Sequence, residues 1–196
     1  MEDHAKVGMK TLAIAGCIGH IGTTTQAIQA TMALQKMGKS CYMEMNRTEY
    51  LERLVMLYSN AQDEKEKVIY SNIELYKRNF GKIISANKYD YVVKDFGSAD
   101  LESFEEASFS GQKIKIVVCG SKPNEIFKTQ EILRNPIYDD AYFIFSFVPE
   151  DERVSIASLM AERAEKTFFA EITTDPFLLT SDSVKMYNKI LMMERQ

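Results

Sequence analysis

The sequence TLAIAGCIGHIGTTT at residues 11–25 joins a short apolar run to a glycine loop and three threonines. An apolar run of this length is typical of a strand buried on both faces of a parallel sheet. A strand, a glycine loop and a helix start bring backbone N–H groups and the positive end of a helix dipole to one point. The stretch therefore predicts an anion-binding loop, whose candidate residues are Gly19, His20, Ile21, Gly22, Thr23, Thr24 and Thr25.

Apolar runs alternate with helix-like segments along the rest of the chain. The expected strands are 11–15, 41–45, 68–70, 73–76, 91–93, 114–119, 142–148 and 167–172, and the expected helices are 23–37, 50–58, 125–133, 154–165 and 183–193. Because most strands are followed by helices, the pattern predicts a doubly wound α/β fold: a mostly parallel sheet with helices on both faces. No linker-like segment or repeat divides the sequence, so we expect residues 1–196 to form one domain.

Composition and charge exclude several classes of protein. The 24 basic and 28 acidic residues give a net charge of −4, which argues against nonspecific binding of nucleic acid. The longest apolar stretches run to about seven residues, far short of the ~20 that span a bilayer. We therefore expect a cytoplasmic protein that meets a membrane only indirectly. Cys17, Cys41 and Cys119 lie in or beside apolar runs without zinc-ligand spacing, which favours buried, reduced thiols.

The glycine loop departs from the standard phosphate-binding pattern G-x-x-x-x-G-K-[ST], in which the Lys contacts phosphates and the hydroxyl holds magnesium. If Gly22 is aligned with the second glycine, Cys17 stands at the first glycine and Thr23 stands where the Lys belongs. Thr24 then takes the position of the magnesium ligand. The loop alone is therefore weak evidence for a nucleotide site.

Residues 10–46 resemble the opening of the ParA/MinD group of P-loop ATPases, whose loop reads roughly K-G-G-x-G-K-T-T. Here IGHIGTTT at residues 18–25 is followed by a helix, a glycine and the strand YMEMN at residues 42–46. YDYVVKD at residues 89–95 is similar to the second acidic strand of that group, and the Asp-Pro dipeptide at 175–176 resembles its closing segment. The resemblance implies the P-loop NTPase fold and a site for ATP or ADP, with Mg²⁺ held by Thr24 and, through water, by Asp95.

Several residues that the ParA/MinD group uses are replaced in this chain. Ile18 stands at the signature Lys that reaches a partner's phosphates, and Thr23 stands at the P-loop Lys. Asn46 falls near the acid that orients the attacking water, with Glu44 at its companion position, and FSF at 145–147 replaces the segment with the adenine-reading Asn. Cationic groups alone contribute ~10³–10⁵ to the rate of phosphoryl transfer, so these losses argue against fast hydrolysis and leave no confident catalytic residue.

Two basic residues are candidates to replace the missing lysines. Arg47 follows the second expected strand, and Lys122 lies just past the strand at 114–119, so both belong to the edge where the glycine loop is expected. For both residues, a solvated loop charge is the favoured interpretation. His20 has the same two interpretations, as a donor to a ligand oxygen or as a loop residue without a ligand.

Two functions follow from these observations. The favoured one is a degenerate ParA/MinD-like protein with impaired or absent hydrolysis, which acts as a regulatory or binding protein by forming a homodimer or by docking to a heteromeric partner assembly. The alternative is a slow ATPase or nucleotide-dependent switch, in which Arg47, Lys122 or a residue of a partner replaces the missing Lys.

Overall fold

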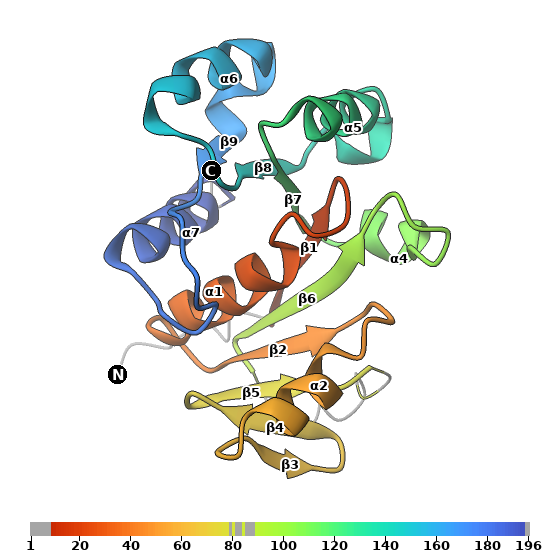
Figure 1. Cartoon of the computed structure of the whole chain (residues 1–196), viewed down its shortest axis with the longest axis vertical. Coiled ribbons are helices and arrows are strands. Elements are labelled where there is room, and N and C mark those ends of the chain that lie inside the picture. Colours follow the sequence, from red (N-terminus) through yellow and green to blue (C-terminus); the bar gives the residue numbers. More distant parts are fainter. Residues whose placement is uncertain (1–8, 79, 81–83, 85–88, 195–196) are drawn as a thin grey trace, which may run out of the picture.

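A computed structural model describes residues 9–78, 80, 84 and 89–194 of the chain (Figure 1). The strands are β1 (Lys10–Gly16), β2 (Ser40–Glu44), β3 (Gln62–Glu64), β4 (Lys67–Tyr70), β5 (Ile73–Tyr76), β6 (Tyr91–Ser98), β7 (Ile114–Cys119), β8 (Tyr142–Phe145) and β9 (Thr167–Phe169). The α-helices are α1 (Thr23–Gln35), α2 (Tyr50–Leu57), α4 (Glu106–Ser110), α5 (Pro123–Leu133), α6 (Arg153–Leu159) and α7 (Ser181–Met193). Short 3₁₀ helices are η1 (Pro136–Tyr138), η2 (Glu150–Glu152) and η3 (Ala161–Lys166).

Within the described residues, the strands form one sheet in the order β3-β4-β5-β2-β6-β1-β7-β8-β9. All neighbours from β5 to β9 in this order are parallel, whereas β4 pairs antiparallel with both β3 and β5 at one edge of the sheet. The predicted α/β fold with a mostly parallel sheet is therefore confirmed. β1 lies between β6 and β7. The strands β2 to β6 lie on one side of β1, and the later strands β7 to β9 lie on the other. In such sheets the ligand crevice lies beyond the carboxyl ends of the strands at this reversal.

Side-chain contacts of β6 show that helices cover both faces of the sheet. Successive residues of a strand point to opposite faces. Asp95 accepts a hydrogen bond from Thr24 of α1, whereas the ring of Phe96 lies 5.3 Å from the ring of Phe109 in α4. The helix α7 lies beside α1 (Figure 1), and the Tyr187 hydroxyl donates to the carbonyl of Gln26. The predicted helix layers on both faces are thus present.

The core lies along the central strands. Residues 12–15 of β1 are fully buried, as expected for a strand covered on both faces. A smaller apolar cluster on the face opposite α1 is made of Cys41, Met43, Tyr76, Ile84, Tyr89 and Val92. The three cysteines are free and buried, as the sequence predicts. Among the described residues, none of the helices has both the length and the apolar character that crossing a membrane requires.

Several element boundaries differ from the prediction because non-glycine residues adopt left-handed backbone conformations. The expected helix at 154–165 is divided into α6 and η3, since Ala161 has a φ of 49°. The expected strand at 142–148 ends at Phe145, because Phe147 has a φ of 60°. The strand β3 and the helix α4 are not among the elements that the sequence predicts.

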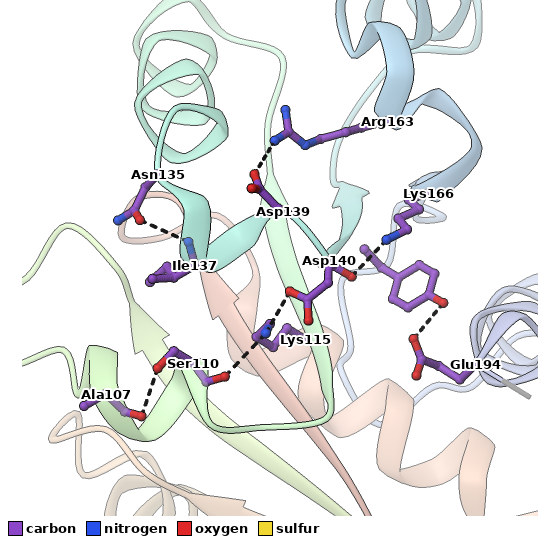
Figure 2. Close-up of polar contacts among 11 residues, drawn as sticks. Ala107, Ser110, Lys115, Asn135, Ile137, Asp139, Asp140, Arg163, Lys166 and Glu194 are labelled. Atoms are coloured by element: carbon purple, nitrogen blue, oxygen red, sulfur yellow. Dashed lines mark hydrogen bonds and ion pairs between the residues drawn. The ribbon is translucent and has the colours of Figure 1, made fainter.

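A buried lysine connects three segments at the amino ends of β7 and β8, away from the glycine loop (Figure 2). The Lys115 ammonium lies 2.7 Å from a carboxylate oxygen of Asp140 and donates to the carbonyl of Ser110 at 3.4 Å. The neighbouring Asp139 pairs with Arg163 of η3 at 2.7 Å. These contacts hold the end of α4 and η3 to the start of β8.

Candidate functional site

The glycine loop leaves the carboxyl end of β1 and enters α1 with an open helix amino terminus. Gly22 precedes α1 with a φ of 90°, a conformation that favours glycine. No side chain caps the helix, and its first turn contains no acidic residue. The backbone N–H groups of residues 23–25 accordingly have no acceptor among the described residues. Unpaired N–H groups at the positive end of a helix dipole form a binding site for an anion.

A cavity of about 900 Å³ opens in front of this helix terminus. It brings together most of the residues predicted from the loop: Gly19, His20, Gly22, Thr23, Thr24 and Thr25. Ile21 is the exception, because its side chain is buried below the loop, close to Gly16 and Gly120. The buried Ile21 side chain holds the loop to the core, while the backbone of the next residue, Gly22, lines the cavity.

Thr24 connects the cavity to a buried carboxylate. Its hydroxyl donates to an oxygen of Asp95 at 2.7 Å, and the Tyr42 hydroxyl donates to the same oxygen at 2.8 Å. The other carboxylate oxygen accepts from the backbone N–H of Gly97 at 2.9 Å. Burial raises the pKa of Asp95, and these hydrogen bonds oppose that rise. Asp95 has no exposed surface and does not line the cavity, so it acts on a ligand through Thr24.

The Thr24 and Asp95 pair suits magnesium, which prefers hard oxygen ligands. Because the Thr24 hydroxyl donates its proton to Asp95, its lone pairs are free to face a cation. Among the residues that the structure describes, no three His, Cys, Asp or Glu side chains gather as a metal site. A magnesium ion here would therefore need oxygen ligands from a phosphate and from water.

Glu44 and Asn46 maintain the structure of the segment after β2. The Glu44 carboxylate is buried beside Asp95 on the neighbouring strand and accepts from the Tyr50 backbone N–H at 2.8 Å. Burial raises the pKa of Glu44 to about 7. The Asn46 side chain accepts from the Thr48 backbone N–H and donates to the carbonyl of Asp95. Both side chains thus fix the start of α2.

The two predicted replacement cations lie in different places. Arg47 lines the cavity. Lys122 does not: it caps α5, its side chain is 75% exposed, and its ammonium lies 3.8 Å from Glu125. The structure adds a cation that the sequence analysis missed, Arg53 of α2, which also lines the cavity. Arg53 lies three residues after the cavity residue Tyr50 and shares its face of α2, but the sequence does not show which face of this helix meets the cavity.

An aromatic ring forms one side of the cavity mouth. Phe147 is 51% exposed, lines the cavity and lies close enough to Gly22 that a Cβ there would be 3.7 Å from the ring. The adjacent Ser146 hydroxyl is buried and has no hydrogen-bond partner among the described residues. The segment at 145–147 therefore presents an aromatic ring to the cavity.

The sequence matches no protein-family model, and no curated protein has a matching sequence. The fold, by contrast, is similar to that of solved ATPases. A ParA family ATPase from Chlorobium tepidum is 12% identical with a TM-score of 0.56, over 96% of this chain and 94% of the other. A plasmid partition protein from Borrelia burgdorferi with bound AMPPNP is 16% identical with a TM-score of 0.58, over 94% and 98%. MinD in a MinC:MinD complex from Aquifex aeolicus is 15% identical with a TM-score of 0.56, over 95% and 89%.

These likenesses extend over nearly the whole of this chain and of each solved chain. They agree with the resemblance found in the sequence at the glycine loop and the second acidic strand. At such low identity they establish architecture. The chain therefore has the α/β fold of the ParA and MinD group of P-loop ATPases.

Proposed function

We propose that this chain, as one domain, binds a nucleotide at the glycine loop, hydrolyses it slowly or not at all, and acts as a regulatory or binding protein. The observation that carries this proposal is the cavity of about 900 Å³ at the uncapped amino terminus of α1, whose described lining residues include no lysine. Backbone N–H groups and the Thr24 hydroxyl supply the groups for binding phosphate and magnesium. The group that would stabilise a transferring phosphoryl, the P-loop Lys, is replaced by Thr23.

The solved relatives support the nucleotide and the partner in this proposal. The Borrelia burgdorferi partition protein was solved with AMPPNP, and MinD of Aquifex aeolicus was solved with MinC. By analogy, the ligand of this chain is ATP or ADP with Mg²⁺, and its output is contact with a second copy or with a different protein. Weak binding is expected, because two lysines of the group are absent.

A slow ATPase or nucleotide-dependent switch is the second candidate. The observation that favours it is the position of Arg47 on the cavity wall. A guanidinium there could neutralise phosphate charge in place of the missing Lys. This candidate requires magnesium-dependent turnover that Arg47→Ala abolishes.

The proposal is tested by titrating the protein with ATP, ADP and GTP, with and without Mg²⁺, while its melting temperature is followed. A ligand at a hundred times its Kd stabilises the native state by about 2.7 kcal/mol, which gives a measurable shift. Release of phosphate from ATP is measured in parallel. We expect a magnesium-dependent shift with little or no turnover, whereas fast turnover would contradict the proposal.

Gly19 offers a matched pair of variants for this test. Gly19 is exposed, has no positive φ, and a Cβ built there meets no atom within 4 Å, so a side chain is tolerated. Gly19→Asp adds a negative charge at the cavity, and Gly19→Asn adds nearly the same volume without the charge. Gly19→Asp should remove the ATP-dependent shift and Gly19→Asn should keep most of it. Equal shifts in both variants would place the nucleotide elsewhere.

A further inference from the structure

Two guanidinium groups line the cavity on the side formed by the segment after β2. Arg47 lies in the turn between β2 and α2, and Arg53 lies one turn into α2. Tyr50 and Arg53 are three residues apart and share one face of the helix, and both line the cavity. Leu51 and Leu54 are buried on another face of α2 and fix its rotation. The position of Arg53 at the cavity is therefore set by the packing of the helix.

The turn that carries Arg47 is held by hydrogen bonds to buried or partly buried side chains. The Asn46 side-chain oxygen accepts from the Thr48 backbone N–H at 2.9 Å, and the Glu44 carboxylate accepts from the Tyr50 backbone N–H at 2.8 Å. Glu49 closes the turn with a φ of 55°. Both arginines consequently extend from a fixed backbone, so a ligand does not have to order the turn itself when it binds.

Neither arginine has a carboxylate partner in the part of the chain that the structure describes. Among the described residues, ion pairs within 4.0 Å form at other lysines and arginines and include neither Arg47 nor Arg53. In the part of the chain that the structure describes, Asp100 is the one carboxylate that lines the cavity, and it accepts a hydrogen bond from Ser98. The cavity therefore combines two unpaired guanidinium groups with the positive end of α1, an arrangement suited to a ligand with several negative charges.

We propose that Arg53, together with Arg47, binds the terminal phosphates of a polyphosphate whose other end lies on the glycine loop. This inference rests on the proposed function, because it assumes phosphate on the loop. A guanidinium group binds two oxygens of a phosphate at once, so two of them match an extended chain of phosphates. A monophosphate on the loop is too short and carries too little charge to contact the glycine loop and the two arginines at once. The ligand class is thus a triphosphate, either free or as part of a nucleotide.

The experiment is calorimetric titration of the full chain with inorganic triphosphate, ATP and AMP at low and at high salt. Arg53→Ala is compared with Arg53→Lys and with Arg134→Ala, a control at an exposed arginine that ends α5 outside the cavity. We expect Arg53→Ala to weaken triphosphate and ATP binding by about tenfold or more at low salt, and less at high salt. AMP binding should change by less than about twofold, and Arg53→Lys should restore part of the loss.

The outcomes separate this inference from the proposed function. If Arg53→Ala binds triphosphate as the unchanged chain does, while Gly19→Asp abolishes binding, the role of Arg53 is overturned and the loop site stands. If the unchanged chain binds neither triphosphate nor ATP, the proposed function fails and the role of Arg53 fails with it. A loss with ATP but none with inorganic triphosphate would show that Arg53 contacts the nucleoside, which also overturns the inference.

Discussion

Removal of the Tyr42 hydroxyl tests the hydrogen-bond network that holds Thr24 at the cavity. Asp95 is fully buried and receives side-chain or backbone donors from Thr24, Tyr42 and Gly97 at 2.7–2.9 Å. Tyr42→Phe removes one donor and leaves the ring in place. A hydrogen bond to a charged group contributes about 1.5–3 kcal/mol, and the two remaining donors keep part of that, so we expect a loss of about 2 kcal/mol. For a chain of this length the melting temperature should fall by about 4–8 °C.

The loss should depend on pH in a defined direction. Burial already holds the pKa of Asp95 above its ordinary value, so the native state binds more protons than the unfolded chain between the two pKa values. Stability therefore falls as the pH rises through this window. Loss of the Tyr42 donor raises the pKa of Asp95 further and widens the window upward. The deficit of Tyr42→Phe should be largest at alkaline pH and should shrink as the pH falls and Asp95 becomes protonated in both proteins.

The assay is urea denaturation followed by circular dichroism at pH 8 and pH 5. Tyr91→Phe is the matched control, because Tyr91 is buried on β6 and its hydroxyl has no partner among the described residues. A deficit equal to that of Tyr91→Phe, or one that does not change with pH, would refute the network as described.

Three further substitutions test other parts of the structure. Burial raises the pKa of Glu44 to about 7, so its contribution to stability falls as the pH rises from 4.5 to 7. Glu44→Gln should therefore be more stable than the unchanged chain above pH 7, by about 1–3 kcal/mol, and lose that advantage near pH 5, as urea denaturation will show. Asp140→Asn should lower stability by about 1 kcal/mol in urea denaturation, because the buried Lys115 ammonium loses its charged partner. No loss of stability at any pH would show that solvent screens this ion pair. Thr23→Lys should tighten ATP binding by about tenfold or more without fast turnover. Fast turnover from this change alone would show that the lysine was the only missing catalytic group.

The sequence predicted the sheet because the information is local. A fully apolar run such as residues 12–15 is stable in a parallel sheet only when it is buried on both faces. The structure shows these four residues fully buried in β1. The glycine loop could be predicted for the same reason, since a strand, glycines and a helix start occur in one continuous stretch. The resemblance to the ParA and MinD group then extended the prediction to the whole chain.

The position of side chains around the cavity could not be predicted in the same way. Lys122 follows a strand and belongs to the expected edge, but the next residue, Pro123, starts α5, and Glu125 folds back onto the Lys122 backbone N–H. Its side chain consequently points to solvent. The position of Arg53 depends on the rotation of α2, which is set by the burial of Leu51 and Leu54 in the main core.

Residues with left-handed backbone conformations explain the differences between the predicted and observed ends of two elements. Phe147 and Ala161 have positive φ angles although neither is glycine, so residue propensities do not predict these conformations. The first ends β8 and turns an aromatic ring toward the cavity, and the second divides the expected helix. Such conformations depend on tertiary contacts, which one sequence does not reveal.

The most direct test of the phosphate site is the amide NMR spectrum of the isotope-labelled chain during titration with inorganic triphosphate. We expect saturable shifts of the backbone N–H signals of Gly19, Gly22 and residues 23–25, because these groups lie at the cavity without a hydrogen-bond partner among the described residues. The signals near Lys115, which lies at the amino ends of the strands and away from the glycine loop, should not move. An unchanged glycine loop at saturating triphosphate, or shifts confined to exposed lysines elsewhere, would contradict it.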